Sequence, residues 1–219
     1  MSAAIPTMTQ ISMQLLYSTS SPFVRKTVLL AQALGLSDQI ERLPSAASPL
    51  KRDPRITCHN PLGKVPTLVT EEGLALIDSK LIAEYLCALA PNEQVIPAAG
   101  LERWKILRQQ ALADGILEVA VGLRYENATR PAELRWAEWT QAQMEKILAA
   151  LQALQDEFPA PTAEGPLNVG EIAVVSALGY LDFRYADFGW RTRYPQLASA
   201  YALVLERPDV KASAPVLAS

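Results

Sequence analysis

The sequence predicts a protein in two parts, an α/β domain followed by an all-α domain. Strand and helix patterns alternate only in the first part of the chain, a proline-marked break follows, and no strand pattern returns after Gly100. A chain of 219 residues is long enough for two small domains that each bury a core. We therefore expect a first domain at 12–90, a linker at 91–98 and a helical domain at 99–219.

The first domain begins with a β-α unit. Residues 13–17 form an apolar run that ends in a Ser/Thr cluster, which is typical of a short strand. Pro22 then stands where a first helical residue is favoured, and the apolar periodicity continues to about Leu34, before Gly35. A second short strand is expected at 39–43.

The rest of this domain is predicted to contain a loop, a hairpin and a helix. Residues 44–60 are polar and proline-punctuated, and a loop of that length is often functional. Two apolar runs, 65–70 and 74–77, are joined by three residues that end in glycine, which indicates a hairpin. Asp78-Ser79 then caps a helix whose apolar residues recur at helical spacing.

Long helices fill the second half. One is predicted at 101–127 and another from Pro131, taken as its first helical residue, to Phe158, before the Pro-Ala-Pro sequence at 159–161. Asn168 and Glu171 have the spacing of a capping box. A buried helix should follow as far as Leu181.

Composition excludes several classes of function. A net charge of −3 and a pI of about 5.3 argue against a nucleic-acid partner. No apolar run approaches the roughly 18 residues of a membrane-spanning helix, and residues 1–12 lack the basic charge of a targeting segment. We expect a cytoplasmic protein that does not bind membranes. Cys58 and Cys87 lack metal-ligand spacing, so no metal is expected.

The stretch 15–26 carries the clearest sign of chemistry. A strand runs into a hydroxyl-rich turn, and a helix starts there whose first amides have no partner within the helix. Such a turn suits an anion or a thiolate. Our hypothesis is that Ser21, or another serine of the turn, holds the sulfur of a thiol cofactor.

Four motifs in order resemble the glutathione transferase superfamily, over roughly residues 12–216. Ser-Pro-Phe-Val-Arg-Lys at 21–26 resembles the active-site turn of serine-type members, including the plant tau class and many bacterial ones. The segment 60–66 resembles the sequence before that family's cis-proline, Asp78-Ser79 stands where the family places an acid and a serine, and the capping box at 168–171 matches as well.

The resemblance implies a thioredoxin-like N-terminal domain, in the order βαβ then ββα, and a helical domain that contributes the pocket for a hydrophobic substrate. It implies glutathione as cosubstrate, a small hydrophobic electrophile as second substrate, a role in detoxification, and a homodimer with helices 101–158 at its interface. The reaction would be conjugation of glutathione, with reduction of organic peroxides as a further activity. A non-catalytic binding or interaction module of the same fold is the alternative, and a glutathione-dependent isomerase is a third.

The mechanism implied is stabilisation of the glutathione thiolate. A free thiol with a pKa near ~8.5 is mostly protonated at neutral pH, and a hydroxyl donor together with a helix N-terminus favours the anion. Alignment through Pro22 and Gly35 favours Ser21 as that donor, while other classes place theirs at Ser20 or Ser18. A cysteine, which a thioltransferase would need, is absent from this position.

The remaining contacts with glutathione are also carried over from the family. Asp78 and Ser79 should bind the glutamyl end, and the backbone at Val65, before a cis Pro66, should pair with the cysteinyl part. Lys51 or Lys64, or the neighbouring Arg52 or Arg55, would meet the glycyl carboxylate.

Three further residues complete the expectations. Phe23 should form a wall of the electrophile pocket, for which Trp104, Tyr125 and Trp190 are further candidates. Asp114 should reach the glutathione of a partner subunit, as an acid does in some classes. Arg25 and Lys26, adjacent charges on the first turns of a helix, are expected to face solvent.

Overall fold

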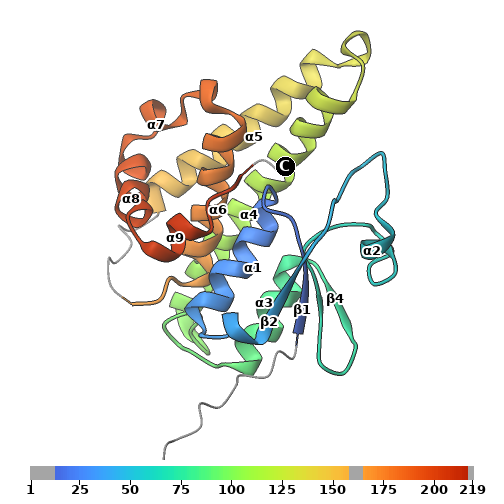
Figure 1. Cartoon of the computed structure of the whole chain (residues 1–219). Coiled ribbons are helices and arrows are strands. Elements are labelled where there is room, and N and C mark those ends of the chain that lie inside the picture. The colour runs from blue at the N-terminus through green and yellow to red at the C-terminus, as the bar shows by residue number, and fades with distance from the viewer. Residues whose placement is uncertain (1–12, 158–164, 217–219) are drawn as a thin grey trace, which may run out of the picture.

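The N-terminal domain is built on a four-stranded mixed sheet (Figure 1). The computed structural model describes residues 13–157 and 165–216. Strand β1 pairs in parallel with β2 and antiparallel with β3, which pairs antiparallel with β4, so the order across the sheet is β2-β1-β3-β4. The strands are β1 (Met13–Tyr17), β2 (Ile40–Pro44), β3 (Thr67–Val69) and β4 (Ala75–Ile77).

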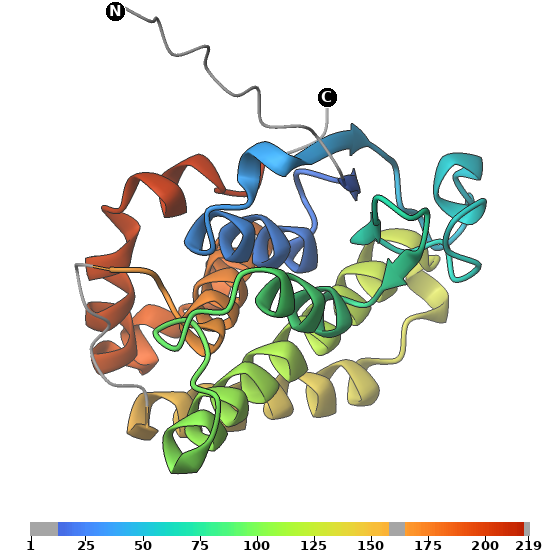
Figure 2. The ribbon, with the colours of Figure 1, turned by 90° about the horizontal axis from the view of Figure 1, so that it is seen from below.

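Helices α1 (Pro22–Ala33) and α3 (Ser79–Leu89) lie between this sheet and the helical domain (Figure 2). Helix α1 starts as predicted, with Ser21 as its N-cap and Pro22 in the first position. After its end, Gly35 adopts φ +70°, a left-handed conformation that glycine tolerates without strain. A 3-10 turn at Ser37–Gln39 then leads into β2.

The C-terminal domain is helical throughout its described residues. Asn168 and Glu171 form the predicted capping box, with each backbone amide donating to the other's side chain at 2.8 to 2.9 Å. The α-helices are α4 (Gly100–Thr129), α5 (Ala137–Glu157), α6 (Val169–Arg184), α7 (Trp190–Arg193), α8 (Pro195–Leu205) and α9 (Pro208–Ala212), with 3-10 turns at Ala132–Leu134 and Ala186–Phe188.

The predicted start of the second long helix is wrong. Pro131 has φ −51° and ψ 140°, which is extended, and a 3-10 turn follows it before α5 begins at Ala137. Arg130 is extended as well, as expected for a residue that precedes proline. The predicted end at Phe158 and the Pro-Ala-Pro sequence lie outside the described residues.

The connection 44–60 also contains an element that was not predicted. Helix α2 (Pro54–Thr57) is one turn long, and the Asp53 carboxylate caps it by accepting from the amide of Arg55 at 2.9 Å. Capping aspartate followed by proline is a helix-start signal, but no apolar periodicity follows it.

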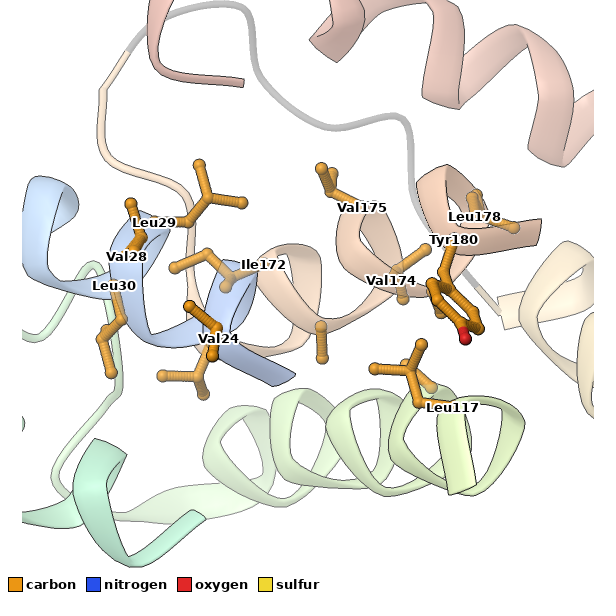
Figure 3. Packing of buried hydrophobic residues seen from close by; sticks show 14 of the residues in the cluster. Val24, Val28, Leu29, Leu30, Leu117, Ile172, Val174, Val175, Leu178 and Tyr180 are labelled. Atoms are coloured by element: carbon orange, nitrogen blue, oxygen red, sulfur yellow. The ribbon is translucent and has the colours of Figure 1, made fainter. Parts of the chain in front are cut away.

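Helix α6 is the centre of the molecule, buried along most of its length between α1 and α4. Figure 3 shows Val24 and Val28 of α1 near Ile172 of α6, and Leu117 of α4 near Tyr180 at the other end of the same core. The helix that starts at the serine turn is therefore held by both domains. No helix in the described ranges combines the length and apolarity needed to cross a membrane.

Arg25 joins the domains and corrects the prediction that it faces solvent. Only 5% of its surface is exposed, and its guanidinium donates to the carbonyls of Val175 and Val210 and to the hydroxyl of Ser213 at 3.2 to 3.3 Å. These acceptors lie on α6 and in the C-terminal segment. A side chain predicted at the surface thus fastens helix α1 to the second domain.

Candidate functional site

The serine turn lies where β1 ends and α1 begins. Ser21 Oγ accepts a hydrogen bond from the amide of Val24 at 3.3 Å, the usual N-cap contact. That bond uses a lone pair of the hydroxyl and leaves its proton to donate. The amide of Phe23, in the first turn, has no acceptor within the helix. Two donors are thus available at one point, which suits a thiolate.

Ser18 and Ser20 are arranged differently. Their hydroxyl oxygens lie 3.4 Å apart, so that one donates to the other. The backbone of Ser21 donates to the carbonyl of Ser18 at 3.1 Å and closes the turn. Thr19, between them, contacts Val216 near the C-terminus through both its hydroxyl and its backbone carbonyl. Of the three candidate serines, Ser21 is the one at the helix cap.

A cis peptide bond joins Val65 to Pro66, as predicted. Asn60 holds the preceding loop, because its amide donates to the carbonyl of Lys64 and to the hydroxyl of Thr67, both at 3.0 Å. Asn60 and Thr67 are almost fully buried. This internal network fixes the backbone at Val65, as a strand-like contact with a peptide would require.

Asp78 adopts φ 73°, the one non-glycine positive φ in the described part of the chain. A strained backbone conformation of this kind is often found at binding sites. Its carboxylate accepts from the amide of Lys80 at 2.8 Å and caps α3, as predicted. Ser79, the first residue of that helix, is 6% exposed.

Sheet register brings these three motifs together. Leu16 of β1 faces Thr67 of β3, and Thr67 faces Ile77 of β4. One residue further along each strand, Tyr17, Pro66 and Asp78 therefore come side by side, next to the start of the serine turn. The segments predicted to bind one extended ligand lie along a single edge of the domain.

Lys26 and Asp114 form a buried ion pair beneath α3, and the prediction that Lys26 faces solvent is wrong. Lys26 is 4% exposed instead of facing solvent, and its ammonium also donates to Ser79 Oγ at 3.3 Å. Asp114 is fully buried within its own chain, where Lys80 approaches its second oxygen to 3.8 Å. Its contact with the glutathione of a partner subunit stays a prediction.

The Lys26 contact was missed by sequence reasoning, although it touches a predicted binding residue. Burial lowers the pKa of Lys26, and the charge of Asp114 opposes that shift. By donating to the Ser79 oxygen, the ammonium leaves the serine proton free to point away from it. The only sign of this contact in the sequence was the charge of Lys26, and no neighbouring residue distinguishes a buried lysine from an exposed one.

The four cations at 51–64 that were predicted to meet the glycyl carboxylate fall into two groups. Arg55 pairs with Asp53, which holds the pKa of that carboxyl well below its usual range, and Arg52 donates to the carbonyl of Pro61. Lys51 and Lys64 are exposed and form no ion pair among the described residues. They are the cations of this loop that remain available to a ligand carboxylate.

The aromatic candidates fall into two groups. Phe23 is half-buried beside the serine turn, and Tyr125 and Trp104 are exposed by 37% and 64%. Trp190 is 2% exposed and donates to Asp182 at 2.8 Å, so it belongs to the core and is not a pocket wall.

A cavity in the described part of the chain lies away from the serine turn. It has a volume of about 510 Å³ and lies among α3, α4 and the connection between them, with Lys80, Cys87, Arg103 and Asp114 in its lining. Burial raises the pKa of the Cys87 thiol, which keeps it protonated and unreactive. Within the described ranges, no three His, Cys, Asp or Glu side chains are placed to hold a metal.

Comparison with known proteins identifies the family. Residues 20–89 match the model of the glutathione S-transferase N-terminal domain, and residues 137–202 match that of the C-terminal domain. The GST-like protein YibF of Escherichia coli K12, described as uncharacterized, is 35% identical over 205 residues, which cover 93% of this chain and 98% of YibF. The chain belongs to the glutathione S-transferase superfamily.

Solved structures of the superfamily agree with this fold. A glutathione transferase family member from Pseudomonas fluorescens Pf-5, with bound glutathione, is 38% identical and superposes with a TM-score of 0.89 over 94% of this chain and all of its own. A second structure with the same description, with bound S-(propanoic acid)-glutathione, superposes with a TM-score of 0.85 at the same identity and coverage. A glutathione S-transferase from Methylobacillus flagellatus KT, with glutathione bound, is 33% identical, with a TM-score of 0.83 over 94% of this chain and all of its own. The thioredoxin-like and helical domains expected from sequence are confirmed.

Proposed function

We propose that this protein is a glutathione transferase that binds glutathione as a thiolate at Ser21 and adds it to a small hydrophobic electrophile. The observation that carries the proposal is the Ser21 cap, where a hydroxyl proton and the Phe23 amide are both available to one sulfur. Relatives at 33% to 38% identity with bound glutathione support this ligand. The relative with bound S-(propanoic acid)-glutathione supports conjugation, since its ligand is substituted on sulfur.

The extended ligand would lie along the edge formed by the three motifs. Its cysteinyl backbone would pair with Val65 before the cis-proline, and its glutamyl carboxylate would meet the start of α3 at Ser79. The ammonium of the same end would meet Asp78, and Lys51 or Lys64 would receive the glycyl carboxylate.

The chemical step needs no general base in this proposal. Glutathione loses its thiol proton to solvent on binding, and the hydroxyl of Ser21 and the helix N-terminus stabilise the sulfur anion. With a chloronitroarene, sulfur attacks the carbon that bears chlorine, the carbon–sulfur bond forms and chloride leaves. The protein's contribution is a larger thiolate fraction at neutral pH.

Substitution of single hydroxyls tests the assignment. We expect Ser21→Ala to lower kcat/KM for a chloronitroarene by about 10²-fold, the loss typical of one removed donor at an anion site. Ser18→Ala and Ser20→Ala, which break only the bond between these two hydroxyls, should retain most of the rate. The thiol pKa of bound glutathione, followed by thiolate absorbance, should rise toward that of free glutathione in Ser21→Ala alone.

The same titration distinguishes the alternatives. A protein that binds glutathione without lowering its thiol pKa would be a binding module, and full activity in Ser21→Ala would refute the assigned donor. Turnover of a maleyl-type substrate without loss of glutathione would indicate an isomerase instead. Reduction of an organic peroxide, assayed with the same variants, tests the second activity.

We also propose a homodimer assembled through the long helices α4 and α5. Large apolar side chains are exposed at the two ends of this pair: Leu101 at 72% and Trp104 at 64% in the first turns of α4, and Leu134 at 61% and Trp136 at 63% in the connection from α4 to α5. Such exposure is unusual for a surface that stays in water. Sedimentation of the full chain should give about twice the monomer mass, and a monomer at micromolar concentration would count against the dimer.

A further inference from the structure

The ends of α4 and α6 extend past the start of α1, above the serine turn. Leu30 of α1 lines the same small space as Gln110 of α4, and one turn earlier Lys26 contacts Asp114, so the two helices run in opposite directions. Helix α6 is also antiparallel to α1, because Leu30 lies near Val169 and Arg25 contacts Val175. The start of α1 lies one helical turn before Arg25 and Lys26. The serine turn is therefore level with the last turns of α6 and with the second half of α4. In Figure 1, α4 likewise continues beyond the start of α1.

Two arginines and three tyrosines gather at this end, and we call them the arginine–tyrosine cluster: Arg124, Tyr125, Tyr180, Arg184 and Tyr185. Tyr185 donates to the carbonyl of Ala120 at 2.6 Å, which joins α6 to α4. Arg124 is one turn beyond Ala120 on the same face of α4. The Arg184 guanidinium lies over the Phe183 ring, with its carbon 4.1 Å from the ring centre.

The tyrosines of this cluster remain neutral. Burial raises the pKa of Tyr180 and of Tyr185, and the charges of Arg124 and Arg184 oppose the shift without reversing it. The phenols therefore do not neutralise the guanidinium groups beside them.

Neither arginine of the cluster has a carboxylate partner. Among the residues that the structure describes, no Asp or Glu oxygen lies within 4.0 Å of Arg124 or Arg184, and the Nε of Arg184 is buried without a hydrogen-bond acceptor. Both side chains are half-buried. By contrast, Arg130 at the end of α4 pairs with Glu126, and Arg191 pairs with Asp182. A guanidinium that is partly removed from water without a counter-charge is poised to receive an anion.

We propose that the electrophile of this transferase carries a carboxylate on an aromatic or short unsaturated body, and that Arg124 and Arg184 bind that carboxylate. The inference rests on the proposed function, because the register of the helices brings the cluster level with the start of α1, where the sulfur would be held. Guanidinium groups bind carboxylates through paired hydrogen bonds, and the surrounding rings offer an apolar surface to the rest of the molecule. The two arginines therefore select an acidic second substrate over a neutral one.

Binding of two product-like conjugates tests the proposal without requiring turnover. The probes are S-(4-carboxybenzyl)glutathione and S-(4-carbamoylbenzyl)glutathione, which differ only in the charge at the ring's far end. In the wild-type protein we expect the acid to bind about tenfold more tightly, the gain of one good charged contact. Arg124→Gln and Arg184→Gln should each reduce this ratio, and the double variant should bring it to about one, while affinity for the amide is unchanged.

The control variant is Arg130→Gln, which removes a paired positive charge from the end of α4 and should leave the ratio at its wild-type value. Because Arg184→Gln could perturb folding, the ratio is also measured in the wild-type protein at rising salt, where it should fall. If both conjugates bind equally and neither substitution changes the ratio, the proposed function stands and this inference is overturned. If neither conjugate binds, the proposed function fails, and the inference fails with it.

Discussion

At the scale of single residues, a buried ammonium links both domains to the predicted glutamyl site. Lys26 of α1 contacts Asp114 of α4 and Ser79 of α3, and all three side chains are almost fully buried. A buried pair of this kind can be replaced by apolar residues at little cost, but removing one partner leaves a charge without compensation. Substitution of one partner should therefore lower stability, and apolar substitution of both partners should largely restore it.

We predict that Lys26→Met lowers the free energy of unfolding by about 3–5 kcal/mol, because Asp114 is then buried without its cation. Asp114→Asn should have a loss in the same direction, and the double variant Lys26→Met/Asp114→Leu should be more stable than either single one. Urea unfolding measures all three. The control is Lys105→Ala, which breaks an exposed pair with Glu102 on the same helix and should change stability by less than about 1 kcal/mol. Additive losses in the double variant would refute a coupled pair.

Sequence alone could not place these residues. Arg25 and Lys26 are neighbours on a helix, where charged side chains are usually solvated, and their partners lie 53 to 188 positions away. The cap at Ser21, the cis bond at Pro66 and the cap at Asp78 were predictable because their determinants lie within a few residues. Burial of a charge is set by tertiary packing, which has no local signal.

At the scale of elements, we expect the capping box of α6 to make stability depend on pH. Burial raises the pKa of Glu171 above its usual value of 4.5. The folded protein thus holds this proton more tightly than the unfolded chain, and stability falls as pH rises through the window just above 4.5. Glutamine retains the capping geometry without ionising.

We therefore predict that Glu171→Gln removes part of the loss of stability that the wild-type protein shows between acid and neutral pH. Denaturant unfolding at a series of pH values in this window measures the slope for both proteins. Parallel slopes would mean that Glu171 titrates in the folded state as it does in the unfolded one.

Close packing of α6 against α1 gives a second prediction for this element. A Cβ on Gly179 would overlap the Arg25 guanidinium and lie 3.0 Å from the Tyr201 hydroxyl, so Gly179→Ala should destabilise the fold by about 1–3 kcal/mol. The matched control is Gly122→Ala on α4, where a Cβ meets nothing within 4 Å. There, alanine should stabilise the helix by roughly 0.5–1 kcal/mol. Thermal unfolding measures both variants. A change of stability in the same direction for both would contradict the packing argument.

Elements were predicted best where two local signals agreed. Helix α1 has a capping serine, a proline and apolar periodicity, and α6 has a complete capping box, so both starts were confirmed. Pro131 offered one signal alone, which a turn satisfies equally well, and α5 starts at Ala137 instead. A proline indicates a change of direction, but periodicity decides where a helix follows.

At the scale of the whole molecule, the candidate site depends on a helix that both domains hold. Helix α1 presents Ser21 at its start, contacts α6 along its length and is fastened by Arg25 to the C-terminal segment. The tail also returns to the serine turn, where the amide of Val216 donates to the carbonyl of Thr19 at 3.4 Å. The proposed sulfur site would thus be formed within the first domain but positioned by the second.

From this arrangement we predict that Arg25→Met destabilises both domains together, by about 3 kcal/mol for the charged hydrogen bonds lost. All 4 tryptophans, at 104, 136, 139 and 190, lie in the helical domain, so their fluorescence reports its unfolding. Hydrogen exchange at the buried β1 residues Leu15 and Leu16 reports the sheet. Both should shift equally toward lower denaturant, because α1 is part of each core and neither domain can lose it alone. A fluorescence transition that moves while protection of β1 stays unchanged would show that the domains unfold separately. In that case the orientation of Ser21 would be set within the first domain alone.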